Sequence, residues 1–177
     1  MPLRARLIEA QLLRWTFPES VWAQSLSLAA HGGDDRLRRA LELSFREWLI
    51  CRAYGDRKTP CPSRLVAQSW VCLRRDRDHY RKFRRASLRA CSEEQLRPCL
   101  NDPTSEEFLA LKKAWNRSKL SREKAFSASW TLDHRFEIPE PWGLAPEQVR
   151  PRHEKKFTGG NSEGGYPNSQ LLGGPGI

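Results

Sequence analysis

Basic residues crowd the stretch from position 74 to position 89, where eight of them face only two acidic residues. Cations that contact phosphates need an ordered scaffold, and an α-helix provides one because its residues rise about 1.5 Å each along the axis. Arginine predominates over lysine here, which suits bidentate hydrogen bonding to phosphate and stacking on bases. We therefore predict a face that contacts anions or nucleic acid, formed by Arg74, Arg75, Arg77, Arg81, Lys82, Arg84, Arg85 and Arg89.

The same run of charge has a simpler explanation. A solvated helix face, in which Asp76 and Asp78 pair with neighbouring arginines, would need no ligand, and most charged helix faces are of this kind. No sequence-reading motif accompanies the basic stretch: the chain has no aromatic RNP-type strand, no GXXG loop and no cysteine and histidine finger. Any contact with nucleic acid is therefore expected to involve its backbone and shape.

Other residues with the right chemistry stand in the wrong arrangement for a metal site or for acid–base catalysis. Asp76, Asp78 and His79 are possible metal ligands by type, but the surrounding arginines repel a cation. Asp133 and His134 are neighbours in the sequence, and neighbouring positions on a helix point in different directions. We therefore predict no metal ion and no acid–base pair.

The cysteines indicate reduced thiols in an intracellular compartment. Their number is odd and no two form a C-x-x-C pair, which fits neither a disulfide scaffold nor a zinc knuckle. Cys72 or Cys91 acting as a nucleophile with His79 as its base would lack an activating context beyond nearby arginines. We expect buried structural thiols, no cofactor and no enzymatic activity, for the set Cys51, Cys61, Cys72, Cys91 and Cys99.

The overall charge favours a polyanionic partner. Lys and Arg number 31 against 21 Asp and Glu, giving a net charge of +10 and an isoelectric point near 9.8. Such a balance favours RNA, DNA, anionic lipid or an acidic protein surface without choosing among them. No stretch reaches the roughly 18 consecutive apolar residues of a membrane-spanning helix, so no spanning segment is expected, and peripheral contact with a membrane surface stays an open alternative.

The N-terminal stretch is rich in aromatic residues for a chain whose mean hydropathy is only −0.71. Trp15, Phe17 and Trp22 lie ahead of the clearest core helix, and we predict that they dock onto a partner surface. Three arginines on an apolar background within residues 1–15 resemble an organelle presequence, a reading that Glu9 weakens. The predicted location is therefore mitochondrial.

Hydrophobic periodicity predicts a mainly α-helical fold with one compact core. Apolar residues recur at three- and four-residue spacing most clearly between Leu37 and Arg52, and prolines interrupt the pattern elsewhere. In the first helix the apolar positions Leu3, Leu7, Ala10 and Leu13 share a face. The predicted helices cover residues 3–15, 19–30, 34–52, 63–89 and 104–115, with a further helix from Ser121 through Leu132.

The chain divides into four predicted parts. An N-terminal helical arm covers residues 1–33, and a helical core domain covers residues 34–136. Residues 137–149 form an extended clasp in which Trp142 and Leu144 fold back on the helices, because three prolines exclude a helix there. Residues 150–177 form a basic, glycine-rich tail that is expected to be disordered in isolation.

A series of aromatic, proline and aliphatic residues between positions 37 and 144 has a distinctive spacing. In that spacing the chain resembles the helical N-terminal domain of the bacterial and plant glycine-rich-domain-containing protein family. The resemblance implies a compact helical domain used for interaction. It rests on residues 45–49, on Pro62, Ser63, Arg64, Leu65 and Val66, on Trp70, Tyr80 and Phe83, and on Trp130, Phe136, Pro139, Pro141 and Trp142.

The chain departs from that family at one motif. Trp70, Val71, Cys72 and Leu73 stand where the family has Trp-His-x-His, so a metal or proton role of those histidines cannot be transferred. What remains of the resemblance is the apolar packing set, which is an argument about fold alone.

These features lead to one preferred hypothesis and an alternative. The preferred one is a non-catalytic accessory subunit of a large assembly, best an organellar ribosome or another ribonucleoprotein, that contacts RNA phosphates and neighbouring proteins. The alternative is an accessory subunit of a membrane-associated, respiratory-type complex, held by Trp15, Phe17 and Trp22, with the arginines facing anionic lipid. A degenerate enzyme is the least favoured class.

Overall fold

The computed structural model describes residues 3–27, 34–55, 59–87, 96–99 and 102–149. Within these ranges the protein is mainly α-helical, as the sequence predicts, and has no β-strand beyond a single isolated bridge between Cys61 and Pro98. Arg89 and the glycine-rich tail lie outside the described residues. The elements are α1 (Leu3–Arg14), α2 (Ser20–Leu26), α3 (Asp35–Tyr54), α4 (Arg64–Arg75), α5 (Arg77–Ala86), α6 (Glu106–Trp115), η1 (Leu120–Arg122), η2 (Ala128–Trp130), α7 (Leu132–Arg135) and α8 (Pro146–Val149).

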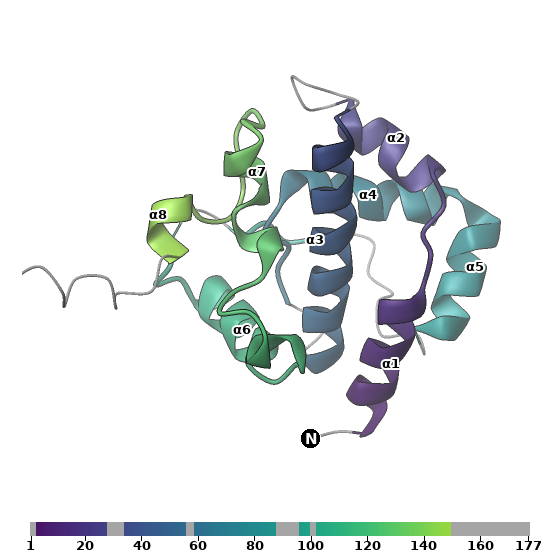
Figure 1. Ribbon diagram of the computed structural model, residues 1–177, viewed down its shortest axis with the longest axis horizontal. Helices are drawn as coiled ribbons and strands as arrows, with labels where there is room; N and C mark the ends of the chain where they lie inside the picture. Colours follow the sequence, from purple (N-terminus) through teal and green to yellow (C-terminus); the bar gives the residue numbers. More distant parts are fainter. Residues whose placement is uncertain (1–2, 28–33, 56–58, 88–95, 100–101, 150–177) are drawn as a thin grey trace, which may run out of the picture.

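Helix α3 is the central element of the fold. Asp34 caps it by accepting a hydrogen bond from the backbone N–H of Arg36 at 2.8 Å. In Figure 1, α1, α2 and α5 lie to one side of α3, whereas α6, α7 and α8 lie to the other. Residues from both sides join one hydrophobic cluster around its buried side chains Leu37, Leu41, Phe45, Trp48, Leu49 and Ile50.

The N-terminal aromatic residues are part of this core. Phe17 and Trp22 are 5% and 1% exposed, and their rings pack edge-on against Phe45 with centroid distances of 5.0 and 5.7 Å. Trp15 is half-buried with its ring against Phe83. The prediction that these aromatics dock onto a partner is therefore wrong for Phe17 and Trp22, because α1 and α2 fold onto α3 and α4 and bury them within this chain.

Helix α1 also presents a different face from the one that its sequence suggested. It packs against α3 through Ala5, Ile8 and Leu12, all about 2% exposed. Leu3 and Leu7, which the periodicity placed together with Ala10 and Leu13, point to solvent. Both stripes fit a 3.6-residue repeat, and the contact with α3 decides which one is buried.

The predicted long helix over residues 63–89 is interrupted at Asp76. Ser63 begins α4 as expected, accepting a hydrogen bond from the N–H of Val66. Asp76 then ends α4 and begins α5, because its carboxylate accepts the N–H of His79 at 3.2 Å. An aspartate that competes for backbone N–H groups favours a helix end over a helix interior. The basic stretch is thus divided between two helices.

Two further helix predictions are corrected in the C-terminal half. Ser105, and not Thr104, caps α6, since its hydroxyl accepts the N–H of Phe108 while Thr104 bonds Asp102. The predicted helix from Ser121 through Leu132 is replaced by η1, η2 and the start of α7. Residues after α7 return to the core, where Leu144 is fully buried and Trp142 is half-buried.

Candidate anion-binding site on α5

Helix α5 has one buried side and one cationic side. Phe83 is fully buried, and its ring lies 6.0 Å from that of Trp70 on α4. Tyr80 is half-buried beside the same tryptophan, with ring centroids 5.9 Å apart. These two aromatic contacts fix the rotation of α5 on the core, and that rotation determines which arginines face solvent.

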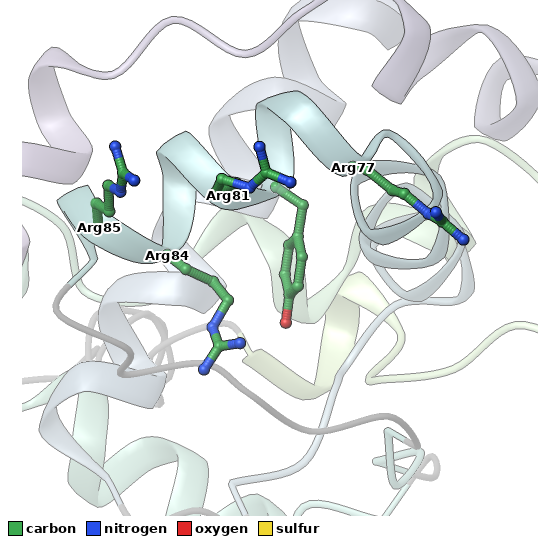
Figure 2. A pocket seen from close by; sticks show the side chains of 5 residues that line it. Arg77, Arg81, Arg84 and Arg85 are labelled. Carbon is green, nitrogen blue, oxygen red and sulfur yellow. The ribbon is translucent and has the colours of Figure 1, made fainter.

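An open pocket of about 360 Å³ lies along the solvent side of α5. Figure 2 shows the four arginine side chains extending from this helix in different directions. Among the described residues, the lining of the pocket contains four cationic side chains and one hydroxyl, and no carboxylate. The lining residues are Arg77, Tyr80, Arg81, Arg84 and Arg85.

Tyr80 holds two of the neighbouring guanidinium groups. The guanidinium carbons of Arg74 and Arg84 each lie 5.9 Å from the centre of its ring. Cation–π contact of this kind restricts arginine side chains that would otherwise move freely at a surface. Arg84 is also half-buried, and its Nε is shielded from solvent without an acceptor among the described residues. An anion in the pocket would supply that acceptor.

The acidic residues near the pocket only partly neutralise it. Asp78 approaches Arg81 at 3.8 Å, but both side chains are largely exposed, so the pair contributes little. Asp76 accepts hydrogen bonds from the Ser20 hydroxyl at 3.1 Å and from His79 Nδ1 at 2.8 Å. The backbone N–H of His79 is the largest cause of the lowered pKa of Asp76. This carboxylate is therefore committed to holding α5 in place.

The predicted basic set divides as follows. The pocket brings together the four arginines of α5, and Arg74 reaches Tyr80 from α4. Lys82 and Arg75 are exposed but do not line the pocket. Tyr80 was assigned only to packing from sequence, although its position three residues after Arg77 and four before Arg84 places it on their face.

The residues considered for metal binding or nucleophilic chemistry have other surroundings. Cys72 is buried, and burial raises the pKa of its thiol, which disfavours the reactive thiolate. Asp133 is buried and accepts hydrogen bonds at the start of α4, whereas Asp78 is exposed. Within the described ranges, no three histidine, cysteine or acidic side chains are grouped so that they would hold a metal ion.

The four cysteines in the described residues are free and buried. Burial raises the pKa of Cys99 to about 12 and that of Cys51 and Cys61 still further. Thiols in this state are protonated and unreactive at neutral pH, which agrees with the predicted structural role. Cys91 lies outside the described residues.

No protein-family model, no curated protein and no solved structure matches this chain. The resemblance to the glycine-rich-domain-containing family therefore stays a prediction. None of the helices in the described part of the chain has the length and apolar character needed to cross a bilayer.

Proposed function

We propose that the protein is a non-catalytic, basic helical accessory subunit that contacts RNA phosphates through α5. The observation that carries this proposal is the pocket whose lining, in the part of the chain that the structure describes, combines four arginines with Tyr80 and includes no carboxylate. Guanidinium groups stay charged throughout the physiological pH range, and their planar fork matches phosphate oxygens. The pocket therefore offers permanent positive charge and directional donors to a phosphate group.

The extent of the site favours a polymer over a single small anion. Arg77 and Arg84 are seven residues apart on one helix, which corresponds to about 10 Å along its axis. In Figure 2 the side chains of Arg77 and Arg84 point in different directions, which favours contacts with separate phosphates over one phosphate held by both. A nucleic-acid strand presents phosphates in series, so several arginines can each contact one, without reading the bases.

A large ribonucleoprotein is the preferred setting, with an organellar ribosome in the mitochondrion as the leading example. The net charge of +10 and the basic segment beyond Arg150 support it, because such assemblies hold basic proteins against RNA. Neither Cys72 nor His79 favours a catalytic role, because Cys72 is buried and His79 Nδ1 contacts the carboxylate of Asp76. We propose no cofactor and no reaction.

Charge neutralisation on α5 tests the RNA contact. The test variant replaces the four pocket arginines with glutamine, and the control replaces four exposed basic residues on α3 and α6, namely Arg36, Arg39, Lys112 and Lys113. Both variants lose the same charge. Affinity for single-stranded RNA, measured by fluorescence anisotropy across a salt series, is expected to fall about 100-fold in the test variant, with the log–log salt slope reduced by about 3.

The control variant should keep most of the affinity and the slope. An equal loss in both variants would show that RNA affinity depends only on net charge, and α5 would then be a solvated face.

A second experiment tests whether the protein belongs to a ribonucleoprotein. The native protein is fractionated by size with and without ribonuclease. Migration in a ribosome-sized particle that ribonuclease destroys is expected, whereas a ribonuclease-resistant, detergent-dependent particle would exclude the ribonucleoprotein.

A further inference from the structure

Helix α1 presents a row of leucines to solvent. Leu3, Leu7 and Leu13 are 73%, 50% and 43% exposed, while the opposite side of the helix packs on α3. Two of these leucines are a helical turn apart and the third lies on the flank of the same surface. Figure 1 places α1 at the edge of the molecule, beside one end of α3. We call this surface the outer face of α1.

The charged residues of the outer face are positive. Arg4, Arg6 and Arg14 are exposed, and Glu9, which is the single acidic residue of α1, is 1% exposed. Its carboxylate accepts hydrogen bonds from the Tyr54 hydroxyl and from the backbone N–H of Lys119. The one negative charge of the helix thus points inward, and the charged groups that α1 exposes are all cationic, beside the neutral Gln11.

We propose that the outer face of α1 is a peripheral membrane contact that inserts its leucines at the interface of a bilayer containing anionic phospholipid. Interfacial helices combine an apolar stripe with arginine or lysine on its flanks and lie in the plane of the headgroups. Arginine stems cover apolar surface while their guanidinium groups stay at headgroup level. The outer face has Arg4 and Arg6 on either side of Leu3 and Leu7, and it does not need Phe17 or Trp22, which are buried.

The same composition fits other occupants less well. The centre of a protein interface is depleted of charged residues and enriched in aromatic ones, but the outer face has arginines beside its leucines and no aromatic residue. A second copy of this chain would bring the arginines of the two helices against one another. An anionic bilayer instead accommodates exposed arginine and leucine side chains on one surface.

Neighbouring elements add to the positive charge. Helix α5 packs beside α1, with the Trp15 and Phe83 rings 6.2 Å apart, and its exposed residues are mostly basic. Partial insertion of three leucines is too weak for stable attachment by itself, so binding should require a second, electrostatic contribution. We therefore expect attachment that depends on anionic lipid and weakens as salt is added.

Vesicle flotation of the full-length protein tests this proposal. The probes are phosphatidylcholine vesicles and vesicles of equal parts phosphatidylcholine and phosphatidylserine. The test variant carries Leu3→Gln, Leu7→Gln and Leu13→Gln, and the control carries Leu43→Gln and Leu109→Gln, which remove exposed leucines from α3 and α6. We expect the wild type and the control to float with the anionic vesicles only. The partition coefficient of the test variant should be at least about tenfold lower than that of the wild type.

Each other result overturns the proposal. Failure of the wild type to float with anionic vesicles excludes the contact, and equal flotation of the test variant shows adsorption by charge alone. Equal loss in the control shows that exposed leucines act regardless of position. RNA affinity of the same variants, which should be unchanged, confirms their folding. It also separates the two proposals, because a protein that floats but binds no RNA would contradict only the proposed function.

Discussion

The carboxylate of Asp133 accepts a hydrogen bond from the hydroxyl of Ser63 at 2.6 Å, although the two residues are 70 positions apart. Its second oxygen accepts the backbone N–H of Arg64 at 2.6 Å and that of Trp142 at 3.0 Å. Asp133 is fully buried. One side chain thus joins the first turn of α4, helix α7 and the returning C-terminal segment, and thereby fixes the helix that leads into α5.

Removing this carboxylate should destabilise the whole fold. Asp133→Ala leaves several buried donors without an acceptor, and we expect the free energy of unfolding to fall by about 3 kcal/mol. Urea denaturation followed by circular dichroism measures the change. Asp133→Asn keeps the size and one acceptor oxygen, so its loss should be smaller. A change below that of an ordinary surface substitution would show that water replaces the carboxylate.

The Asp133→Asn variant also tests the pH dependence. Burial raises the pKa of Asp133 above its ordinary value of 3.8, against the opposing effect of its hydrogen bonds. The native state then binds this proton more tightly than the unfolded state, so the contribution is full below pH 3.8 and is lost as pH rises through the native pKa. The advantage of the wild type over Asp133→Asn should shrink in that direction. If this advantage instead grew with pH, the hydrogen bonds to Asp133 would lower its pKa by more than burial raises it.

Glu47 provides a second buried carboxylate that links distant segments. It is fully buried on α3 and accepts hydrogen bonds at 2.8 Å from Lys124 and Ser127 and at 2.7 Å from the N–H of Ala128. We expect Glu47→Ala to cost about 3 kcal/mol. Lys124→Ala should cost less, about 1–2 kcal/mol, because this lysine is 39% exposed and solvent screens its charge.

Thermal and urea unfolding of these two variants would be compared with those of a surface pair. Glu140→Gln removes the charge partner of Arg64, in an ion pair whose glutamate is 87% exposed. Its cost should stay below about 1 kcal/mol. If Glu47→Ala proves as mild as Glu140→Gln, the segment from Lys124 to Ala128 is not held by this carboxylate.

The sequence predicts the helices well and the connections between them poorly. The apolar repeat from Leu37 to Arg52 sets the central helix without help from the rest of the chain. By contrast, α1 has two stripes of suitable spacing, and only contact with α3 selects the one containing Ile8. The acceptor of the Ser63 hydroxyl lies 70 residues away, where no local pattern reveals it. Local periodicity therefore fixes elements, whereas long-range packing fixes faces.

The candidate site was only partly predictable, because its residue types and spacing are visible in the sequence and its long-range contacts are not. The arginines from Arg77 to Arg85 stand out by type, and their spacing places most of them on one face. The break at Asp76 was missed because aspartate is tolerated within exposed helices, and its role as a cap depends on ψ at that residue. The burial of Phe17 and Trp22 could not be predicted without the three-dimensional structure, because exposed and buried aromatic residues look alike in a sequence.

Asp76 should affect both the orientation of α5 and the pH dependence of stability. Asp76→Ala removes the helix cap and the contacts to Ser20 and His79, so the melting temperature should fall by about 3 °C. Asp76→Asn keeps the cap but does not titrate. The pKa of Asp76 is lowered below 3.8, chiefly by the N–H of His79. Its contribution is therefore present above pH 3.8 and is lost as pH falls through the native pKa.

Comparing the melting temperatures of the wild type and Asp76→Asn across the acidic range checks this sign. The melting temperature of the wild type should be higher than that of Asp76→Asn near neutral pH, and this difference should disappear on acidification. RNA affinity offers a second measurement, because a displaced α5 would disturb the pocket beside Tyr80. Unchanged affinity in a destabilised Asp76→Ala variant would show that the contacts of Tyr80 and Phe83 alone orient the helix.

Gly143 is the position where the C-terminal segment lies closest to the core. Its φ of +80° belongs to the left-handed region, and an added Cβ would collide with the backbone carbonyl oxygens of Pro62 and Trp130. Its N–H donates to the Cys99 carbonyl at 2.7 Å, so the backbone cannot shift without losing that bond. Gly143→Ala should therefore reduce the free energy of unfolding by about 2–4 kcal/mol.

The matched control is Gly55→Ala at the end of α3. Gly55 has a negative φ of −88°, and the nearest atom to an added Cβ is the side-chain hydroxyl of Thr59 rather than a backbone atom. Gly55→Ala should reduce the free energy of unfolding by less than Gly143→Ala does, as measured by urea denaturation at constant m-value. Equal losses would mean that the left-handed backbone at Gly143 is not required. The segment carrying Trp142 would then be held by its bond to Asp133 rather than by close backbone packing.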